Sequence, residues 1–120
     1  MLTMLFGVDP DSPVGLSDQI ASQVRGALVS GRLEPGDKLP PARELASGLS
    51  VNMHTVLRAY AALRDDGLVE LRRGRGAQVR PTLDVGVVDL GQQIRALVAA
   101  ATRLGISRDQ LLRRIEEAPG

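Results

Sequence analysis

Several residue types that carry chemistry are absent or scarce in this sequence. The 120 residues contain no cysteine, which excludes disulfides, thiolate nucleophiles and thiolate metal sites. His54 is the single histidine, so a site built on two imidazole ligands is excluded as well. Phe6 and Tyr60 are the only aromatic residues, too few for a platform that stacks single-stranded bases. Because nothing assembles a nucleophile, a base and an oxyanion site, we expect no enzyme, no metal and no cofactor.

Long apolar runs are also missing. No run reaches the roughly 18 residues that a membrane-spanning helix needs. The start of the chain, residues 1–6, lacks the basic stretch and long apolar core of a secretory signal. With 43% hydrophobic residues, the chain can still bury a core, and its length suits one domain or one domain with an appendage. These features predict a soluble, cytoplasmic protein with no membrane partner.

Positive charge is concentrated in the middle of the chain. The overall formal charge is only +1, but residues 37–80 carry eight cationic and five acidic side chains, a balance of +3. Residues 1–36 have a balance of −2, and residues 81–120 have a balance of 0. Fourteen of the 15 cations are arginine, whose guanidinium suits phosphate and guanine. The middle third is therefore the candidate nucleic-acid surface.

Apolar side chains recur at helical spacing in the first two thirds of the chain. The pattern predicts three helices, at about residues 17–30, 40–49 and 52–66. Ser17 and Asn52 are the expected N-caps of the first and third, and Gly31 and Gly67 are expected to close them. Two short helices joined by about three residues form a helix-turn-helix.

The hydrophobic period changes after Gly67. Residues 68–71 and 77–79 are strand-like, and the Arg72-Arg73-Gly74-Arg75-Gly76 segment between them is a basic turn. A hairpin placed after a helix-turn-helix is a wing. Because no acid follows Glu70, we expect Arg72, Arg73, Gly74 and Arg75 to contact phosphate or a minor groove. The alternative is a charged, solvated surface turn.

The third helix offers the candidate base-reading residues. In a helix-turn-helix this helix enters the major groove with its N-terminal residues facing base edges. Asn52 can pair with adenine through its carboxamide. The alternative is a three-helix core whose polar face is merely solvated. The candidate contacts are Asn52, Met53, His54, Thr55 and Arg58.

The last third of the chain has the pattern of a dimerisation element. From residue 87 to residue 104, apolar side chains are spaced 3, 4, 3, 4 and 3 residues apart, as in a coiled-coil seam. A capping box at Ser107 and Gln110 opens a further helix. An arm of ~40 residues cannot bury a core alone, so we expect it to pair with a second copy, although packing within one chain is the alternative. The expected contacts are Val87, Leu90, Ile94, Leu97, Ala101, Leu104, Leu111, Leu112 and Ile115.

Three segments resemble the winged-helix domain of GntR-type bacterial transcription regulators. They are LPPARELA at 39–46, VNMHTVLRAY at 51–60 and RGRG at 73–76, and the resemblance extends over about residues 4–80. The sequence of residues 51–60 and the short tail resemble those of the YtrA-like subgroup. There, two tail helices serve dimerisation, and the genes often neighbour ABC-transporter operons.

The resemblance also implies roles for individual residues. It places the family's helix-2 arginine at Arg43 and its wing-tip pair at Arg73 and Gly74. The recognition-helix contacts fall on Asn52, Met53, His54, Thr55 and Arg58. Many members have arginine where Met53 stands, and because methionine donates no hydrogen bond we expect no guanine reading there.

Together these patterns predict an α+β, mostly helical chain. Residues 1–80 form a winged helix-turn-helix domain, 81–86 a hinge and 87–120 a two-helix dimerisation tail. The predicted function is a homodimeric repressor that binds double-stranded DNA at an inverted-repeat operator, with control of its own operon and an ABC transporter. A small-molecule effector would have to bind between protomers or between tail and winged helix. The alternatives are an architectural DNA-binding protein of low specificity and a winged-helix protein-interaction module.

Overall fold

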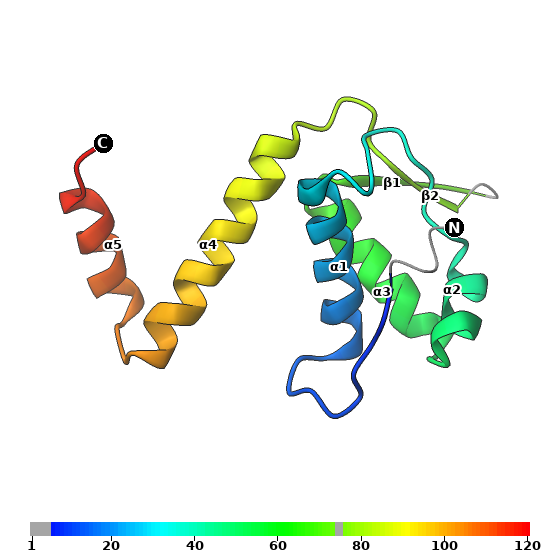
Figure 1. Cartoon of the computed structure of the whole chain (residues 1–120), viewed down its shortest axis with the longest axis horizontal. Helices are drawn as coiled ribbons and strands as arrows, with labels where there is room; N and C mark the ends of the chain where they lie inside the picture. Colours follow the sequence, from blue (N-terminus) through cyan, green and yellow to red (C-terminus); the bar gives the residue numbers. More distant parts are fainter. Residues whose placement is uncertain (1–5, 74–75) are drawn as a thin grey trace.

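The computed structural model of the protein describes residues 6–73 and 76–120. The described elements are α1 (Leu16–Ser30), α2 (Ala42–Leu49), α3 (Met53–Asp65), β1 (Val69–Arg72), β2 (Gly76–Val79), α4 (Val85–Arg103) and α5 (Arg108–Glu117). Helices α1 to α3 and the hairpin form one body, from which α4 and α5 project as an arm (Figure 1). The predicted α+β, mostly helical architecture is confirmed.

One hydrophobic core joins the three helices and the hairpin. Its fully buried side chains come from α1, α2, α3 and β2, and the largest are Ile20, Val24, Leu28, Leu45, Val56, Leu63 and Val79. At the end of α1, Gly31 has φ +80°, so its left-handed conformation closes the helix as predicted. The apolar periodicity thus identified the face of each helix that points inward.

The prediction that Ser17 caps α1 is wrong. Gly15 is the N-cap and offers no side chain, while Ser17 is the second residue of the helix. Its hydroxyl donates instead to the backbone oxygen of Thr55 at 3.0 Å. Ser17 therefore fastens the start of α1 to the start of α3.

The N-terminal segment lies along α1. The side chain of Gln23 bonds to Gly7, and the backbone N–H of Asp9 donates to Gln19 Oε1 at 2.8 Å. Gln19 Nε2 in turn donates to the backbone oxygens of Asp9 and Val14. Two glutamines of α1 thus satisfy the backbone of residues 7–14 and hold it on the same protomer's first helix.

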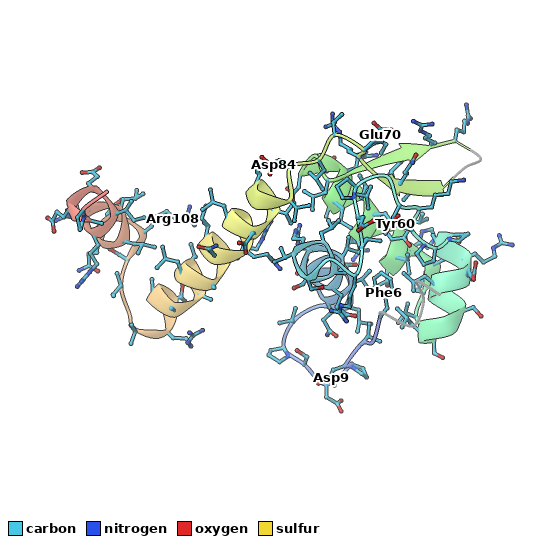
Figure 2. All side chains as sticks on the ribbon, turned by 45° about the horizontal axis from the view of Figure 1, so that its top comes forward. Phe6, Asp9, Tyr60, Glu70, Asp84 and Arg108 are labelled. Atoms are coloured by element: carbon cyan, nitrogen blue, oxygen red, sulfur yellow. The ribbon has the colours of Figure 1, made fainter. Side chains whose placement is uncertain are left out.

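Tyr60 ties α3 to the chain just before α2. It is 3% exposed, and its hydroxyl donates to the carbonyl oxygen of Pro40 at 2.6 Å (labelled in Figure 2). Burial, with a smaller contribution from the charge of Glu44, raises the pKa of the Tyr60 phenol above its usual 10.0. The neutral phenol is therefore part of what fixes the angle between α2 and α3.

Tyr60→Phe tests this tie. We expect about 1–2 kcal/mol lower free energy of unfolding in urea at neutral pH, because the buried Pro40 carbonyl loses its donor. Because folding raises the pKa of Tyr60, its contribution is present below pH 10.0 and lost as pH rises further. Above pH 10.0 the free energy of unfolding should therefore fall less steeply with pH in the variant than in the wild type. Equal stability of the two proteins at neutral pH would contradict the assignment.

The hairpin is held by the chain that precedes α2. The strands pair antiparallel from Val69 opposite Val79 to Arg72 opposite Gly76. Residues 36–39 run beside β2. Lys38 forms an isolated antiparallel β-bridge with Gln78, and the N–H of Leu39 donates to the Ala77 oxygen at 2.9 Å. The β2 side of the wing is therefore held by the segment that precedes α2.

The hairpin register corrects the expectation for Arg72. This residue ends β1 rather than opening the turn, and it lies on the same face of the strand as Glu70. Its Nη2 lies 3.1 Å from Glu70 Oε2, so the charge of Arg72 is balanced, contrary to the prediction. Gly74 and Arg75 lie outside the described residues.

The arm begins on the body and then leaves it. Asp84 caps α4 by accepting from the N–H of Gly86, and Val88, 5% exposed, packs into the main core beside α1. Helix α4 starts at Val85, within the range that the sequence assigned to the hinge. The radius of gyration is 16.0 Å, against about 14 Å for a compact chain of this length, because the rest of the arm projects.

Helix α5 turns back beside the end of α4. Gly105 takes φ +72°, and the predicted capping box is present: Ser107 accepts from the Gln110 N–H, and Gln110 accepts from the Ser107 N–H at 2.8 Å. Neither the 19-residue α4 nor any shorter helix in the described part of the chain could span a bilayer.

Candidate nucleic-acid interface

The connection between α2 and α3 fixes the second helix of the pair. Ser50 closes α2 with φ +55°, the only non-glycine residue with positive φ among those described. The N–H groups of Ser50 and Val51 donate back to the carbonyls of Ser47 and Ala46. This tight reversal turns the chain within three residues and leaves the N-terminus of α3 at the surface.

Asn52 caps α3 as the sequence predicted. Its Oδ1 accepts from the backbone N–H of His54 at 2.8 Å, and its side chain is exposed. The cap uses one of the two lone pairs of that oxygen, which leaves the carboxamide NH₂ group available to a ligand. Asn52 can therefore hold the helix and read a base edge at the same time.

The outward face of α3 carries two of the predicted contacts. His54 and Arg58 are exposed and lie one turn apart, opposite the buried Val56 and Ala59. Sequence reasoning missed Leu57, which is 42% exposed on the same side and offers an apolar contact to a thymine methyl. The available signal was its position outside the inner stripe of the helix.

Two predicted contacts are partly buried. Met53 packs against the hydrophobic core, so part of its side chain supports α3. Thr55 is half-buried, and its carbonyl accepts from the Ser17 hydroxyl. The structure therefore presents Asn52, His54 and Arg58 more openly than these two.

Cations from the other elements complete the surface. Arg43 is exposed in the first turn of α2, Arg73 is exposed at the end of the hairpin, and Lys38 is exposed beside Gln78 of β2. Within the ranges 6–73 and 76–120, neither Arg43, Arg58 nor Arg73 has an acid at ion-pair distance. The electrostatic field of these guanidinium groups is therefore directed at solvent.

The opposite end of α3 is electrically different. Arg64 pairs with Asp65 at 3.2 Å, and Asp66 accepts from Arg25 and Arg95. The helix thus has unpaired cations near its N-terminus and acids at its C-terminus, in addition to the positive N-terminal end of its own dipole. A polyanion is favoured at the N-terminal end of α3.

The arm presents an apolar face rather than a polar one. Seven of its predicted contact residues are between 44% and 75% exposed: Val87, Leu90, Ile94, Leu97, Leu104, Leu112 and Ile115. Leu111 is half-buried, and Ala101 is already buried between α4 and α5. Val98, which the heptad pattern omitted, is exposed on the same side. Large apolar side chains so arranged indicate a contact surface.

This fold, with a polar N-terminus on the second helix of the pair and a basic hairpin, defines a winged helix-turn-helix DNA-binding protein. Residues 16–79 match the model of the gntR family of bacterial regulatory proteins. The HTH-type transcriptional repressor YtrA of Bacillus subtilis is 32% identical over 118 residues, which cover 94% of this chain and 91% of that protein.

Solved structures of related regulators have a similar fold. YtrA from Sulfolobus acidocaldarius, a GntR-family transcription factor, superposes with a TM-score of 0.62 at 35% identity, over 80% of this chain and 95% of that one. The AraR DNA-binding domain in complex with operator ORX1 shares the fold, with a TM-score of 0.56 at 24% identity over 62% and 94% of the two chains. The chain belongs to the GntR family and is a transcription regulator, not an enzyme.

Proposed function

We propose that the protein is a homodimeric repressor that binds a pseudo-palindromic operator. The observation that carries the proposal is the group of unpaired cations on α2, the start of α3 and the wing of a winged-helix fold. Phosphate contacts by Arg43 and Arg73 supply affinity, and Asn52, His54 and Arg58 read base edges from the major groove. The similarity to a protein named as a repressor supports the sign of regulation.

The arm supports the dimer. A two-fold axis brings the same apolar face of α4 and α5 from both protomers together, so each exposed leucine or isoleucine meets an equivalent surface. Two winged helices related in this way require half-sites whose centres are about one helical turn, or ~34 Å, apart. The domain division at residues 81–86 belongs to this proposal, with the arm setting the distance between the two DNA-binding units.

The resemblance to the YtrA-like subgroup indicates which genes the protein controls. The operator lies upstream of the protein's own operon, and the protein controls this operon and the genes of an ABC transporter. The protein itself is in the cytoplasm, where the chromosome is. Reporter expression from that upstream region should rise when the gene is deleted. Unchanged or lower expression would contradict the role of repressor.

Selection from random oligonucleotides at moderate salt tests the function as a whole. We expect the full-length protein to enrich a symmetric sequence. Binding without sequence enrichment would instead favour an architectural DNA-binding protein. No salt-dependent binding at all would favour a protein-interaction module, because phosphate contacts always release counterions.

Arg73→Ala tests the wing. We expect weaker operator binding, and a plot of log affinity against log salt that is shallower by about 1 per protomer, because one phosphate contact is lost. Arg64→Ala is the matched control, since Arg64 is also exposed but lies at the far end of α3 and already pairs with Asp65. If both variants keep the wild-type salt slope, Arg73 does not contact a phosphate of the operator.

A further inference from the structure

A pocket lies where the arm meets the winged-helix body. Its volume is about 470 Å³, within the range of sites for small organic ligands. Its walls come from α1, the end of α3, the connection after β2 and the first three turns of α4. It is on the opposite end of α3 from the candidate base-reading residues, so it is a separate feature of the molecule.

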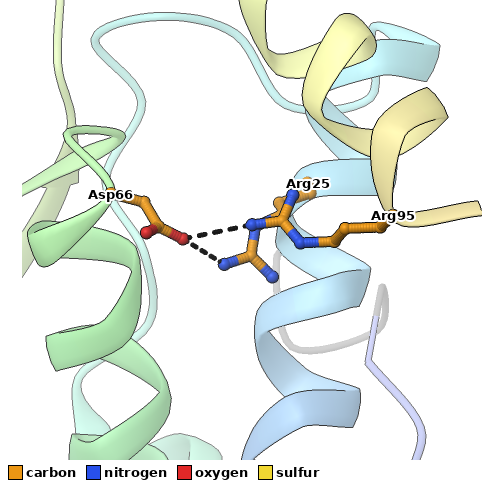
Figure 3. A network of polar contacts seen from close by, with 3 residues as sticks. All are labelled: Arg25, Asp66 and Arg95. Atoms are coloured by element: carbon orange, nitrogen blue, oxygen red, sulfur yellow. Dashed lines mark hydrogen bonds and ion pairs between the residues drawn. The ribbon is translucent and has the colours of Figure 1, made fainter. Parts of the chain in front are cut away.

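Three guanidinium groups line this pocket. Arg25 enters from α1, Arg80 from the end of the wing and Arg95 from α4. One oxygen of Asp66 is shared by two of them: Oδ2 lies 2.6 Å from Arg25 Nη2 and 3.3 Å from Arg95 Nη2 (Figure 3). The second acid in the wall, Asp84, is already used as the cap of α4. Positive charge therefore exceeds negative charge in the pocket.

Arg25 has a donor that the described residues do not satisfy. Its side chain is 10% exposed, and its Nε atom is buried without a hydrogen-bond partner within 6–73 and 76–120. A buried, unpaired donor of a charged group is costly, and such groups in native proteins nearly always have a partner. Arg80 is exposed and makes no ion pair with any described acid. The exposed guanidinium of Arg80 is therefore available to an anion in the pocket.

The remainder of the wall is apolar or small. Leu68, Leu83, Val87 and Val88 line one side. Gly91 leaves space for the guanidinium of Arg95, whose Nη1 would lie 3.4 Å from a Cβ atom at that position. A ligand that fits this lining has an anionic head for the arginines and a short apolar part for the leucine and valine side chains.

We propose that this pocket binds a small organic anion, with one carboxylate or phosphate group on a compact apolar body. The anion accepts from Arg80 and Arg95, whose side chains are exposed and line the pocket. Because the walls belong both to the body and to α4, occupancy changes the angle between them. This regulatory consequence rests on the proposed function, whereas anion binding itself does not.

The test is a titration of the full-length protein with benzoate and, in parallel, phenyl phosphate, followed by proton–nitrogen NMR. We expect saturable shifts at the amides of Gly67 and Gly91 and at the Nε–H of Arg25, and the two probes separate carboxylate from phosphate preference. Arg95→Gln and Arg80→Gln should each weaken probe binding by about tenfold, since each loses a charge-assisted hydrogen bond. Arg64→Gln, a half-exposed arginine outside the pocket, is the control and should bind as wild type.

Three results would overturn the site: no shift at millimolar probe, shifts spread over all exposed arginines without saturation, or equal affinity in Arg95→Gln and wild type. DNA-binding measurements test the regulatory consequence separately from anion binding. If probes bind as expected but the protein selects no DNA sequence, the proposed repressor function fails while the anion site stands. If operator affinity is the same with and without saturating probe, the regulatory coupling is overturned.

Discussion

Leu97→Glu should convert the protein to a monomer. Leu97 is 44% exposed in the middle of the apolar face of α4, so pairing of two arms would bury a carboxylate from each protomer. At ~3 kcal/mol for each unpaired buried charge, the two copies together weaken the dimer by roughly 20,000-fold. Sedimentation at micromolar concentration measures the mass directly, and operator affinity should fall with the loss of the second half-site contact.

Ala99→Glu provides the control for that experiment. Ala99 is exposed on the same helix but two residues further on, which places it on nearly the opposite side of α4. This variant adds the same charge to the same element and should remain a dimer that binds the operator normally. A dimeric Leu97→Glu, or a monomeric Ala99→Glu, would show that the interface lies elsewhere on the arm.

Asn52→Ser should separate the two roles of Asn52. Serine caps a helix about as well as asparagine, so the bond from the His54 N–H is retained. The carboxamide is lost, and operator binding should weaken by about 1–3 kcal/mol, or roughly fivefold to 140-fold. Binding to random duplex should change little, because phosphate contacts are untouched. Competition assays with operator and random DNA measure both quantities.

Asn52→Ala is the comparison variant. It removes the cap as well as the carboxamide and should lower the free energy of unfolding by about 1 kcal/mol, whereas the serine variant should not. Equal loss of affinity for operator and random DNA in Asn52→Ser would mean that Asn52 positions the helix and reads no base.

Features that depend on neighbours in the sequence were predicted well. The glycine that ends α1, the Asn52 cap and the Ser107–Gln110 capping box all involve residues within a few positions of one another. The buried stripe of α3 follows directly from the 3.6-residue period, and four of its members, Val56, Ala59, Tyr60 and Leu63, are all in the core. The change of hydrophobic period after Gly67 predicted the wing, and the resemblance added Arg43 to the candidate contacts. The DNA contacts of single residues stay predictions.

The misses concern contacts between distant residues. Ser17 has the composition of an N-cap, but its partner is the Thr55 carbonyl, 38 residues away. The charge of Arg72 is balanced because the strand register places it on the face of Glu70, which no count of charges reveals. Likewise the meeting of Arg25, Asp66 and Arg95 joins three helices or their ends across 41 and 29 residues. Local propensity and hydrophobic periodicity do not predict such contacts.

The length of α4 has a mechanical consequence. Its 19 residues extend for about 28 Å at 1.5 Å per residue, and only its first turns are fixed to the body. A tilt of about 10° at that fixed end would carry the far tip of so long a rod through about 5 Å. A small shift near Val88 is therefore enlarged at the far end of α4. In the proposed dimer, such a shift would change the spacing of the two DNA-binding units without any rearrangement within either unit.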